Sequence, residues 1–188
     1  MTELKTERLL MRQWTEADRE PFAALNADPA VMEHFPAPMT REQSDALVDR
    51  IITGLATRGY GLWALEVVET GRFIGFTGLS DVRFETRFTP AVEVGWRLSK
   101  DAWGNGYATE AALAALAHAF GPVGLDEVVS FTATTNKPSQ RVMERIGMTH
   151  DEADDFDHPR LEPGHRLERH VLYRISRSQW EAASRGRA

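Results

Sequence analysis

Residues 99–111 read Ser-Lys-Asp-Ala-Trp-Gly-Asn-Gly-Tyr-Ala-Thr-Glu-Ala, a loop with two glycines between two patterned segments. Residues 91–98 alternate between apolar and other side chains, which predicts a strand, and residues 109–120 are rich in Ala, which predicts a helix. The predicted helix carries an apolar stripe at helical spacing: Leu113, Leu116, Ala117 and Phe120. Backbone amides at a helix start point outward, and glycines let an anion approach them closely. The stretch predicts a pyrophosphate site, although a plain tight turn would need the same small residues.

Two common nucleotide-binding loops do not fit this stretch. A P-loop requires Gly-x-x-x-x-Gly-Lys followed by Ser or Thr, and the sequence does not contain this pattern. A Rossmann fingerprint requires a third small residue at the position of Thr109. It also requires an acidic residue at the end of the next strand, whereas Asp126, at about that distance, stands at the start of the next predicted strand. The loop is therefore of another type.

The rest of the chain alternates strands and helices around this loop. A capping box at Thr40 and Gln43, followed by apolar residues at helical spacing up to Gly59, predicts an amphipathic helix. Asn136 is the expected N-cap of a short helix that ends at Gly147. We expect an α/β fold, α+β in stricter schemes, in which helices cover a mixed sheet. Further strands are expected at residues 9–14, 61–68, 72–79, 128–133 and 167–175, and a first helix after Thr15 and Asp18.

The composition is that of an ordinary globular protein. The chain has 188 residues, 42% of them hydrophobic and 27% charged, which predicts a single domain over residues 1–188. Twenty-two basic residues against 28 acidic ones give a net charge of -6, which opposes nucleic acid as a partner. Because there is no cysteine, disulfides, thiolate metal sites and a cysteine nucleophile are excluded.

No targeting or membrane segment is expected. The first ten residues carry Glu3, Lys5, Glu7 and Arg8 without an apolar run, so they do not resemble a signal peptide. The longest apolar run, residues 111–117, is far shorter than the roughly 20 residues that cross a membrane. We expect a cytoplasmic protein with no membrane partner.

Two motifs, in the family's order and spacing, resemble those of the GCN5-related N-acetyltransferase (GNAT) family. The loop Gly104-Asn105-Gly106-Tyr107-Ala108-Thr109-Glu110-Ala111 resembles its acetyl-CoA loop. Residues 136–148 resemble the Asn-x-x-Ser-x-Arg-Val-x-Glu-Lys-x-Gly-Phe signature of its RimJ/RimL-type branch. Residues 6–12 and Asn26-x-Asp28-Pro29 extend the resemblance over nearly the whole chain. The implied fold has a mostly antiparallel sheet with a V-shaped opening between central strands, where coenzyme A inserts.

The resemblance implies which residues contact acetyl-CoA. The amides of the loop would hold the pyrophosphate. The family pattern Gln/Arg-x-x-Gly-x-Gly/Ala opens with a polar side chain, and we take Trp103 as the opening residue, so that side chain is missing here. The implied cofactor contacts lie on the central strand, in the loop and on the later helix: Val94, Gly95, Trp96, Trp103, Gly104, Asn105, Gly106, Tyr107, Ala108, Thr109, Asn136, Ser139 and Arg141.

Acetyl transfer needs a neutral amine, stabilisation of the oxyanion and a proton for the departing thiolate. The resemblance implies Glu93 as the base and the N–H of Gly95 or a neighbour as the oxyanion donor, while a carboxylate on a solvated strand face explains Glu93 equally well. Ser139 resembles the serine that branch members set near the CoA sulfur as a proton donor, or is simply a small polar residue in a first helical turn. Asn136 would contact the pantetheine arm as well as cap its helix, and Arg141 would be a surface or phosphate-side cation.

Residues 150–170 are rich in titratable side chains. They hold seven acidic residues and four of the six histidines: His150, His158, His165 and His170. The spacing matches no zinc pattern, so no metal is expected, and a metal-binding regulatory protein is kept only as a third hypothesis. We expect a loop over the acceptor side in which His158 replaces a branch glutamate as base and Asp157 attracts a cationic amine. A solvated acidic loop is the alternative.

The sequence therefore predicts an N-acetyltransferase that moves the acetyl group of acetyl-CoA directly to a primary amine in a ternary complex. His34 and Phe35 would line the acceptor pocket, and Trp63 would either line it or belong to the core. The acceptor could be a protein N-terminus, an amino acid, a polyamine or an amino sugar, and the protein a monomer or a homodimer. A non-catalytic acyl-CoA-binding module on the same fold is the competing hypothesis.

Overall fold

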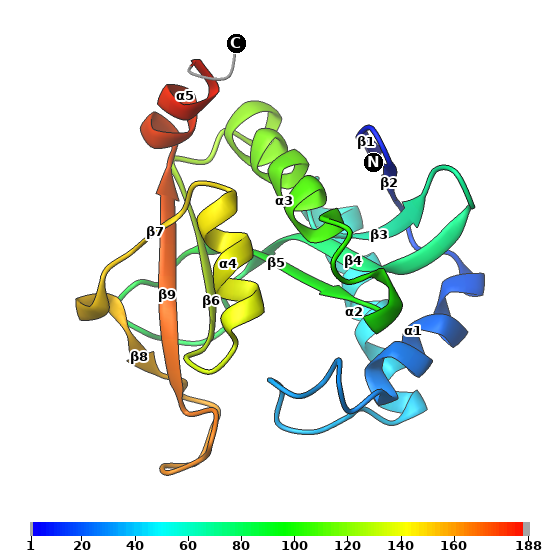
Figure 1. The fold of residues 1–188 in the computed structure, drawn as a ribbon, viewed down its shortest axis with the longest axis horizontal. Helices are drawn as coiled ribbons and strands as arrows, with labels where there is room; N and C mark the ends of the chain where they lie inside the picture. The colour runs from blue at the N-terminus through cyan, green and yellow to red at the C-terminus, as the bar shows by residue number, and fades with distance from the viewer. Residues whose placement is uncertain (1, 186–188) are drawn as a thin grey trace.

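Nine strands form one mixed sheet within residues 2–185, the part of the chain that this computed structural model describes. Their order is β1-β2-β3-β4-β5-β6-β9-β7, and β8 pairs with β9 (Figure 1). The strands are β1 (Leu4–Lys5), β2 (Leu9–Arg12), β3 (Leu62–Val67), β4 (Arg72–Asp81), β5 (Val92–Leu98), β6 (Glu127–Ala133), β7 (Thr149–His150), β8 (Phe156–Asp157) and β9 (Arg169–Ser176). Neighbouring strands are antiparallel except β5 and β6, which are parallel.

The sheet divides at its parallel pair. β5 and β6 are in register only at Glu93 and Val129, and the hydroxyl of Ser130 donates to the carbonyl of Val94 across the 2.8 Å that separate them. Beyond Val94 the two strands diverge, as Figure 1 shows. The predicted V-shaped opening is confirmed at this point of the sheet.

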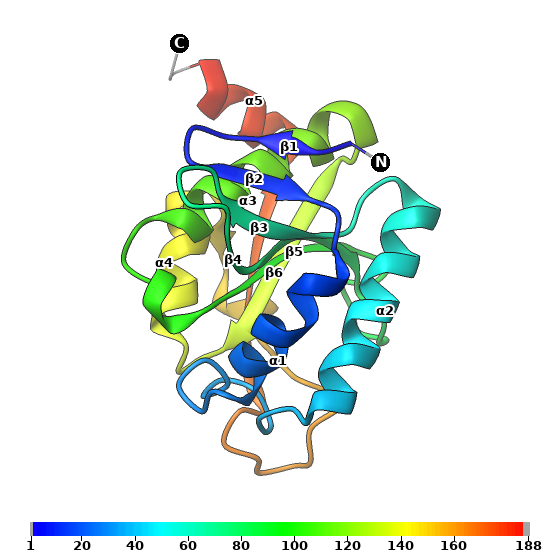
Figure 2. The ribbon, with the colours of Figure 1, turned by 90° about the vertical axis from the view of Figure 1, so that its right-hand side faces the viewer.

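Helices cover both faces of the sheet. α1 (Arg19–Ala27) and α2 (Arg41–Arg58) lie on one face, and α3 (Tyr107–His118) and α4 (Lys137–Arg145) lie on the other (Figure 2). The expected caps are present, because Thr40 and Gln43 form the capping box of α2 and Asn136 caps α4. α5 (Arg177–Arg185), three 3₁₀ turns (Glu16–Asp18, Lys100–Ala102 and Glu152–Asp154) and a π-helical turn (Ala119–Val123) complete the helical elements.

The alternation along β5 directs its side chains to two different environments. Val94 and Leu98 are buried on the face covered by α3. Glu93, Gly95 and Arg97 lie on the other face, the one covered by α1 and α2. Because directly opposite residues of antiparallel neighbours share a face, Arg97 lies beside Phe76, which packs with α1 and α2.

The stripe predicted for α3 is partly wrong. Ala117 is exposed and Leu113 is only half-buried. The buried face is made mainly of small residues: Ala111, Ala112, Ala115, Leu116 and Ala119. Alanines at helical spacing let the helix approach the sheet closely, so the packed side of the helix is rotated away from Leu113.

The other predicted elements are present with small shifts, and several short elements were not predicted. The first strand ends at Arg12, before the expected Trp14, and the last strand begins at Arg169, after the expected residue 167. The unpredicted elements are the strands β1, β7 and β8, the helix α5, and the 3₁₀ and π-helical turns. Within residues 2–185, no helix combines the length and the apolar character that crossing a membrane requires.

Candidate active site

A cleft of about 870 Å³ opens where β5 and β6 diverge. Its walls come from the segment after α1, from α2, from the start of α3, from α4 and from residues 158–170. Most predicted site residues line it: His34, Phe35, Glu93, Gly95, Trp96, Trp103, Gly104, Gly106, Tyr107, Ala108, Thr109, Asn136, Ser139, Arg141 and His158. Four predicted residues, Val94, Asn105, Trp63 and Asp157, do not line it.

The backbone of β5 can offer donors to the cleft only from alternate residues. The bonds from Val82 N–H to the Ala91 carbonyl and from Ser99 N–H to the Ile74 carbonyl show that odd-numbered residues of this segment face β4. The even-numbered residues therefore face β6, as the bond from Ser130 to the Val94 carbonyl confirms. Since β6 pairs with β5 no further than this, the N–H groups of Trp96 and Leu98 have no partner in β6, and that of Trp96 faces the opening nearer to Glu93. Trp96, not Gly95, thus carries the backbone N–H that can meet an oxyanion.

Glu93 lies beside that donor with its carboxyl over Gly95. Its Oε1 is 3.7 Å from where a Cβ on Gly95 would be, so the missing side chain keeps this space open. Burial raises the pKa of Glu93 to about 8, and none of the described residues forms an ion pair with it. A carboxyl that titrates near neutral pH inside a cleft is suited to proton transfer.

The glycine loop presents the start of α3 to the same cleft. Gly104 and Gly106 have φ of 78° and 80°, in the left-handed region that favours glycine. Gly106 is the N-cap of α3, so the first amides of the helix, at Tyr107, Ala108 and Thr109, have no intrahelical acceptor. These N–H groups are a ready site for phosphate oxygens.

Two residues that the sequence analysis did not single out brace this loop. Arg8 donates from Nη1 to the Asn105 carbonyl at 2.9 Å, forms an ion pair with Glu110 and lies 4.9 Å from the ring of Tyr107. Glu110 also accepts from the hydroxyl of Thr6 at 2.6 Å. These donors lower the pKa of Glu110 although burial opposes them. The side chain of Asn105 turns back to the carbonyls of its own loop, so this residue contributes to loop shape and not to the cleft wall.

The expectation that Trp103 opens the family pattern is wrong. Counted back from Gly104 and Gly106, the first position of Gln/Arg-x-x-Gly-x-Gly/Ala is Asp101. Asp101 forms an ion pair with Arg72 of β4, so an acid stands where the family has a polar or basic side chain. Trp103 is 48% exposed, lines the cleft and donates from Nε1 to the Leu98 carbonyl at 3.0 Å.

The start of α4 holds a hydroxyl with a free proton. Asn136 accepts from the N–H of Ser139 and donates through Nδ2 to the Ser139 hydroxyl at 3.1 Å and to Thr132 at 2.8 Å. Because the Ser139 oxygen accepts, its own proton is available to a group in the cleft. Arg141, two residues after Ser139 on α4, lines the cleft and forms no ion pair within the described residues.

His158 belongs to an aromatic wall of the cleft. Its ring lies 4.7 Å from that of Phe84 and 4.9 Å from that of His170. Burial, with a contribution from Arg160, lowers the pKa of His158, and burial lowers the pKa of His170 to about 4. The Nδ1 of His158 accepts the backbone N–H of Arg160 at 3.3 Å, so the basic nitrogen of the neutral ring is already occupied. Within the described residues, no hydrogen bond occupies the Glu93 carboxyl in this way.

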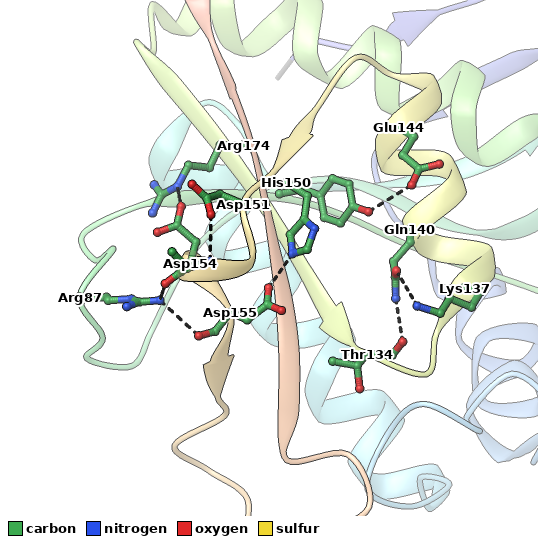
Figure 3. A network of polar contacts seen from close by, with 12 residues as sticks. Arg87, Thr134, Lys137, Gln140, Glu144, His150, Asp151, Asp154, Asp155 and Arg174 are labelled. Carbon is green, nitrogen blue, oxygen red and sulfur yellow. Dashed lines mark hydrogen bonds and ion pairs between the residues drawn. The ribbon is translucent and has the colours of Figure 1, made fainter.

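Several acidic side chains before His158 are engaged in contacts within the molecule, and Figure 3 shows those of Asp151, Asp154 and Asp155. Asp155 accepts from His150 at 2.7 Å, and Arg174 binds Asp154, as Figure 3 shows. Arg174 also forms an ion pair with Glu127. Asp157 pairs with Arg169 and is 62% exposed outside the cleft, so the expectation that it attracts the acceptor is wrong. Within residues 2–185, no group of three or more metal-ligating side chains is arranged to hold an ion.

Burial decides between the two alternatives for Trp63 and corrects the prediction for Val94. Trp63 is fully buried under α3, its Nε1 donates to the Thr2 carbonyl, and its ring meets that of His118 edge to face, so it belongs to the core. Its strand position sends the side chain to the face opposite Glu93. Val94 is also fully buried on the α3 side, and its carbonyl is taken by Ser130.

Known proteins are similar to this chain in sequence and in fold. The acetyltransferase (GNAT) domain family matches residues 8–149. The chain belongs to the GNAT family. It is 34% identical over 187 residues to the FsC-acetyl coenzyme A-N(2)-transacetylase of Aspergillus fumigatus, covering 94% of this chain and 77% of that protein. Among solved structures, an acetyltransferase from Agrobacterium tumefaciens is 28% identical with a TM-score of 0.76, covering 93% of this chain and 94% of that chain. RimL in complex with coenzyme A shares the fold at 18% identity, with a TM-score of 0.73 over 93% of this chain and 98% of that chain.

GNAT membership confirms the predicted enzyme class, an N-acetyltransferase that depends on acetyl-CoA, as its family does. Besides Arg8 and Glu110, the sequence analysis missed Arg97, which lines the cleft and is buried. The resemblance of residues 6–12 to the GNAT opening was a signal for Arg8. Nothing local marked Arg97, because its neighbours come from α1 and the segment after it.

Proposed function

We propose that this GNAT enzyme transfers the acetyl group of acetyl-CoA directly to a primary amine and belongs to the RimJ/RimL-like branch. One observation carries the proposal: a single cleft holds the amides at the start of α3, the Ser139 hydroxyl and, on β5, Glu93 beside the N–H of Trp96. A phosphate-binding end and a proton-transfer end in one cavity suit a thioester that lies along the divided strands. The hydrogen bonds of Asn136 and Ser139 support the branch assignment.

The chemistry uses these groups in order. The neutral amine attacks the thioester carbonyl carbon, and the N–H of Trp96 donates to the oxyanion that forms. Glu93, as carboxylate, accepts a proton from the nitrogen. The carbon–sulfur bond then breaks, and the Ser139 hydroxyl gives its proton to the thiolate. The proton gained by Glu93 balances the one lost by Ser139, and exchange with solvent restores both groups.

Thermal melting with acetyl-CoA tests the cofactor half of this proposal. A ligand at 100 times its Kd stabilises the native state by about 2.7 kcal/mol, which raises Tm by several degrees. Gly106→Trp should abolish the shift, since the side chain would fill the loop. Gly71→Trp is the matched control, because Gly71 also has positive φ, 66°, but stands in the β3–β4 turn with open space around it.

Each result has a definite meaning. A shift in wild type and Gly71→Trp but not in Gly106→Trp supports the proposed cofactor site. Equal rises in Tm for the wild type and both variants would place acetyl-CoA at another site. No rise in Tm for the wild type would overturn the proposal. Release of coenzyme A on addition of amines then separates an enzyme from a binding module.

A further inference from the structure

Arg97 is a buried guanidinium that has no acidic partner among residues 2–185. It is 8% exposed, and within this part of the chain only Nη1 donates to protein atoms, to Asn26 Oδ1 at 2.7 Å and toward the Met39 sulfur at 3.9 Å. Its Nε is buried, and none of the described residues accepts from it. The contrast is Arg12, which is also largely buried but binds the carboxylates of Asp18 and Glu66. Buried arginines normally have such partners, so the site around Arg97 lacks an anion.

The guanidinium is held in place at the edge of the cleft. Its carbon lies 4.1 Å from the ring centroid of Phe35 and 5.6 Å from that of Phe76. Both rings and Arg97 itself line the cleft. Stacking between aromatic rings fixes a guanidinium plane and leaves its edge to bind a carboxylate.

Arg97 shares its face of β5 with the proposed catalytic groups. Glu93, Gly95 and Arg97 are successive residues of one strand face, with about 7 Å between neighbours. Because the Glu93 carboxyl folds over Gly95, an amine held by Glu93 has its substituents within reach of Arg97. The anion that Arg97 lacks is therefore placed to be part of the acceptor.

The charge of the cleft points the same way. The chain is acidic, with 28 acidic and 22 basic residues, yet the cleft is lined by more arginines than acids. Arg141 and Arg145 belong to α4, which contacts α3, the helix that carries the proposed phosphate site. Arg58 is paired with Asp81. The remaining arginines, Arg50, Arg83, Arg97 and Arg160, form no ion pair within the described residues. Such a lining favours an anionic acceptor over a polyamine.

We propose that the acceptor amine carries a carboxylate that binds Arg97, and that its remaining substituent is apolar. The apolar part is assigned to the wall formed by Phe84, Phe131 and His158. An amino acid with an aromatic or aliphatic side chain, free or modified away from its amine and carboxylate, has this chemistry. The inference rests on the proposed acetyl transfer and names its substrate class.

Matched acceptors test the inference. Phenylalanine, phenylalaninamide and phenethylamine have the same ring and the same primary amine. They differ in the group beside the amine, which is a carboxylate in the first, a neutral amide in the second and absent in the third. Leucine and leucinamide form a second set. The amine of an amino-acid amide has a lower pKa than that of the free amino acid, so kcat/KM is calculated for the neutral amine of each acceptor. On this basis we expect kcat/KM for the carboxylates to exceed that for the amides by about tenfold or more. Arg97→Met should reduce this ratio to about one, and Arg97→Lys should restore part of it. Arg41→Gln, which removes an exposed arginine outside the cleft, should leave the ratio unchanged.

The ratio separates recognition from structure. If Arg97 only supports Phe35, its replacement lowers the rates of carboxylates and amides alike, and the unchanged ratio overturns the inference. Amides or phenethylamine acetylated as well as the carboxylates also overturn it, while acetyl transfer itself stands. If no amine is acetylated although acetyl-CoA raises Tm, the acceptor assignment fails and the cofactor site stands. Absence of both effects is failure of the proposed function.

Discussion

Glu93 and Glu110 show how immediate neighbours decide what a glutamate can do. Both lose water on folding, which favours the neutral acid. Glu110 accepts from Thr6 and Arg8, and its pKa is lowered. Glu93 has no such donors, and burial raises its pKa to about 8. Only Glu93 therefore changes charge in the range where amine acetylation operates.

The titration of Glu93 should appear in the rate. Below about pH 8 the carboxyl is mostly protonated and cannot accept a proton, so kcat/KM should rise with pH and level off above this value. Glu93→Gln should lower kcat/KM by roughly 10²- to 10⁴-fold and remove that inflection. Glu69→Gln, an exposed glutamate in the β3–β4 turn, is the control. The ionisation of the acceptor amine contributes equally to both enzymes, so the ratio of their profiles isolates Glu93. A flat ratio would assign the base to another group.

At the scale of elements, segments far apart in the sequence shape the cofactor loop. β2 begins just after Arg8, which reaches across to the Asn105 carbonyl and to Glu110 on α3. Arg8→Ala should raise the Kd for acetyl-CoA about two- to tenfold, because the loop loses a charge-assisted bond that fixes it. The free energy of unfolding should change by less than about 1 kcal/mol, as is usual when an exposed ion pair is removed. Isothermal titration calorimetry with acetyl-CoA measures the Kd. Arg41→Ala is the matched control, because it removes the exposed ion pair with Asp45. Equal Kd values in the two variants would exclude the bracing role of Arg8.

The elements predicted from sequence are those with local signals. The capping box of α2 and the N-cap of α4 depend on side chains within a few residues of each other, and both are present. β1, β7 and β8 have two residues each and exist because β2 and β9 offer them partners, so no local pattern marks them. The packed side of α3 also escaped prediction, because the sheet and not the helix selects its small residues.

The same division holds for the site across the whole molecule. The glycine loop and the start of α4 are contiguous motifs, and all of their predicted residues except Asn105 line the cleft. Trp63 and Asp157 were judged by residue type alone, and neither lines the cleft. Trp63 lies on the buried face of its strand, and Asp157 pairs with Arg169. Arg97 depends on Asn26, Phe35 and Phe76, which only the packing of α1 against the sheet brings together.

The cleft also makes the whole molecule's stability depend on pH in two opposite ways. Glu93 binds its proton more tightly in the folded state, so its contribution to stability is lost as pH rises from about 4.5 to about 8. His170, whose folded pKa falls to about 4, costs stability as pH falls below 6.5, because the unfolded chain takes up that proton more readily. The free energy of unfolding of Glu93→Gln relative to wild type should therefore increase from pH 5 to pH 8, by at most about 1.4 kcal/mol per pH unit. Urea denaturation at each pH measures it, with Glu69→Gln expected to run parallel to wild type. A constant difference between Glu93→Gln and wild type would mean that Glu93 keeps the same proton affinity in the folded and unfolded chain, and its use as a base near neutral pH would lose its physical basis.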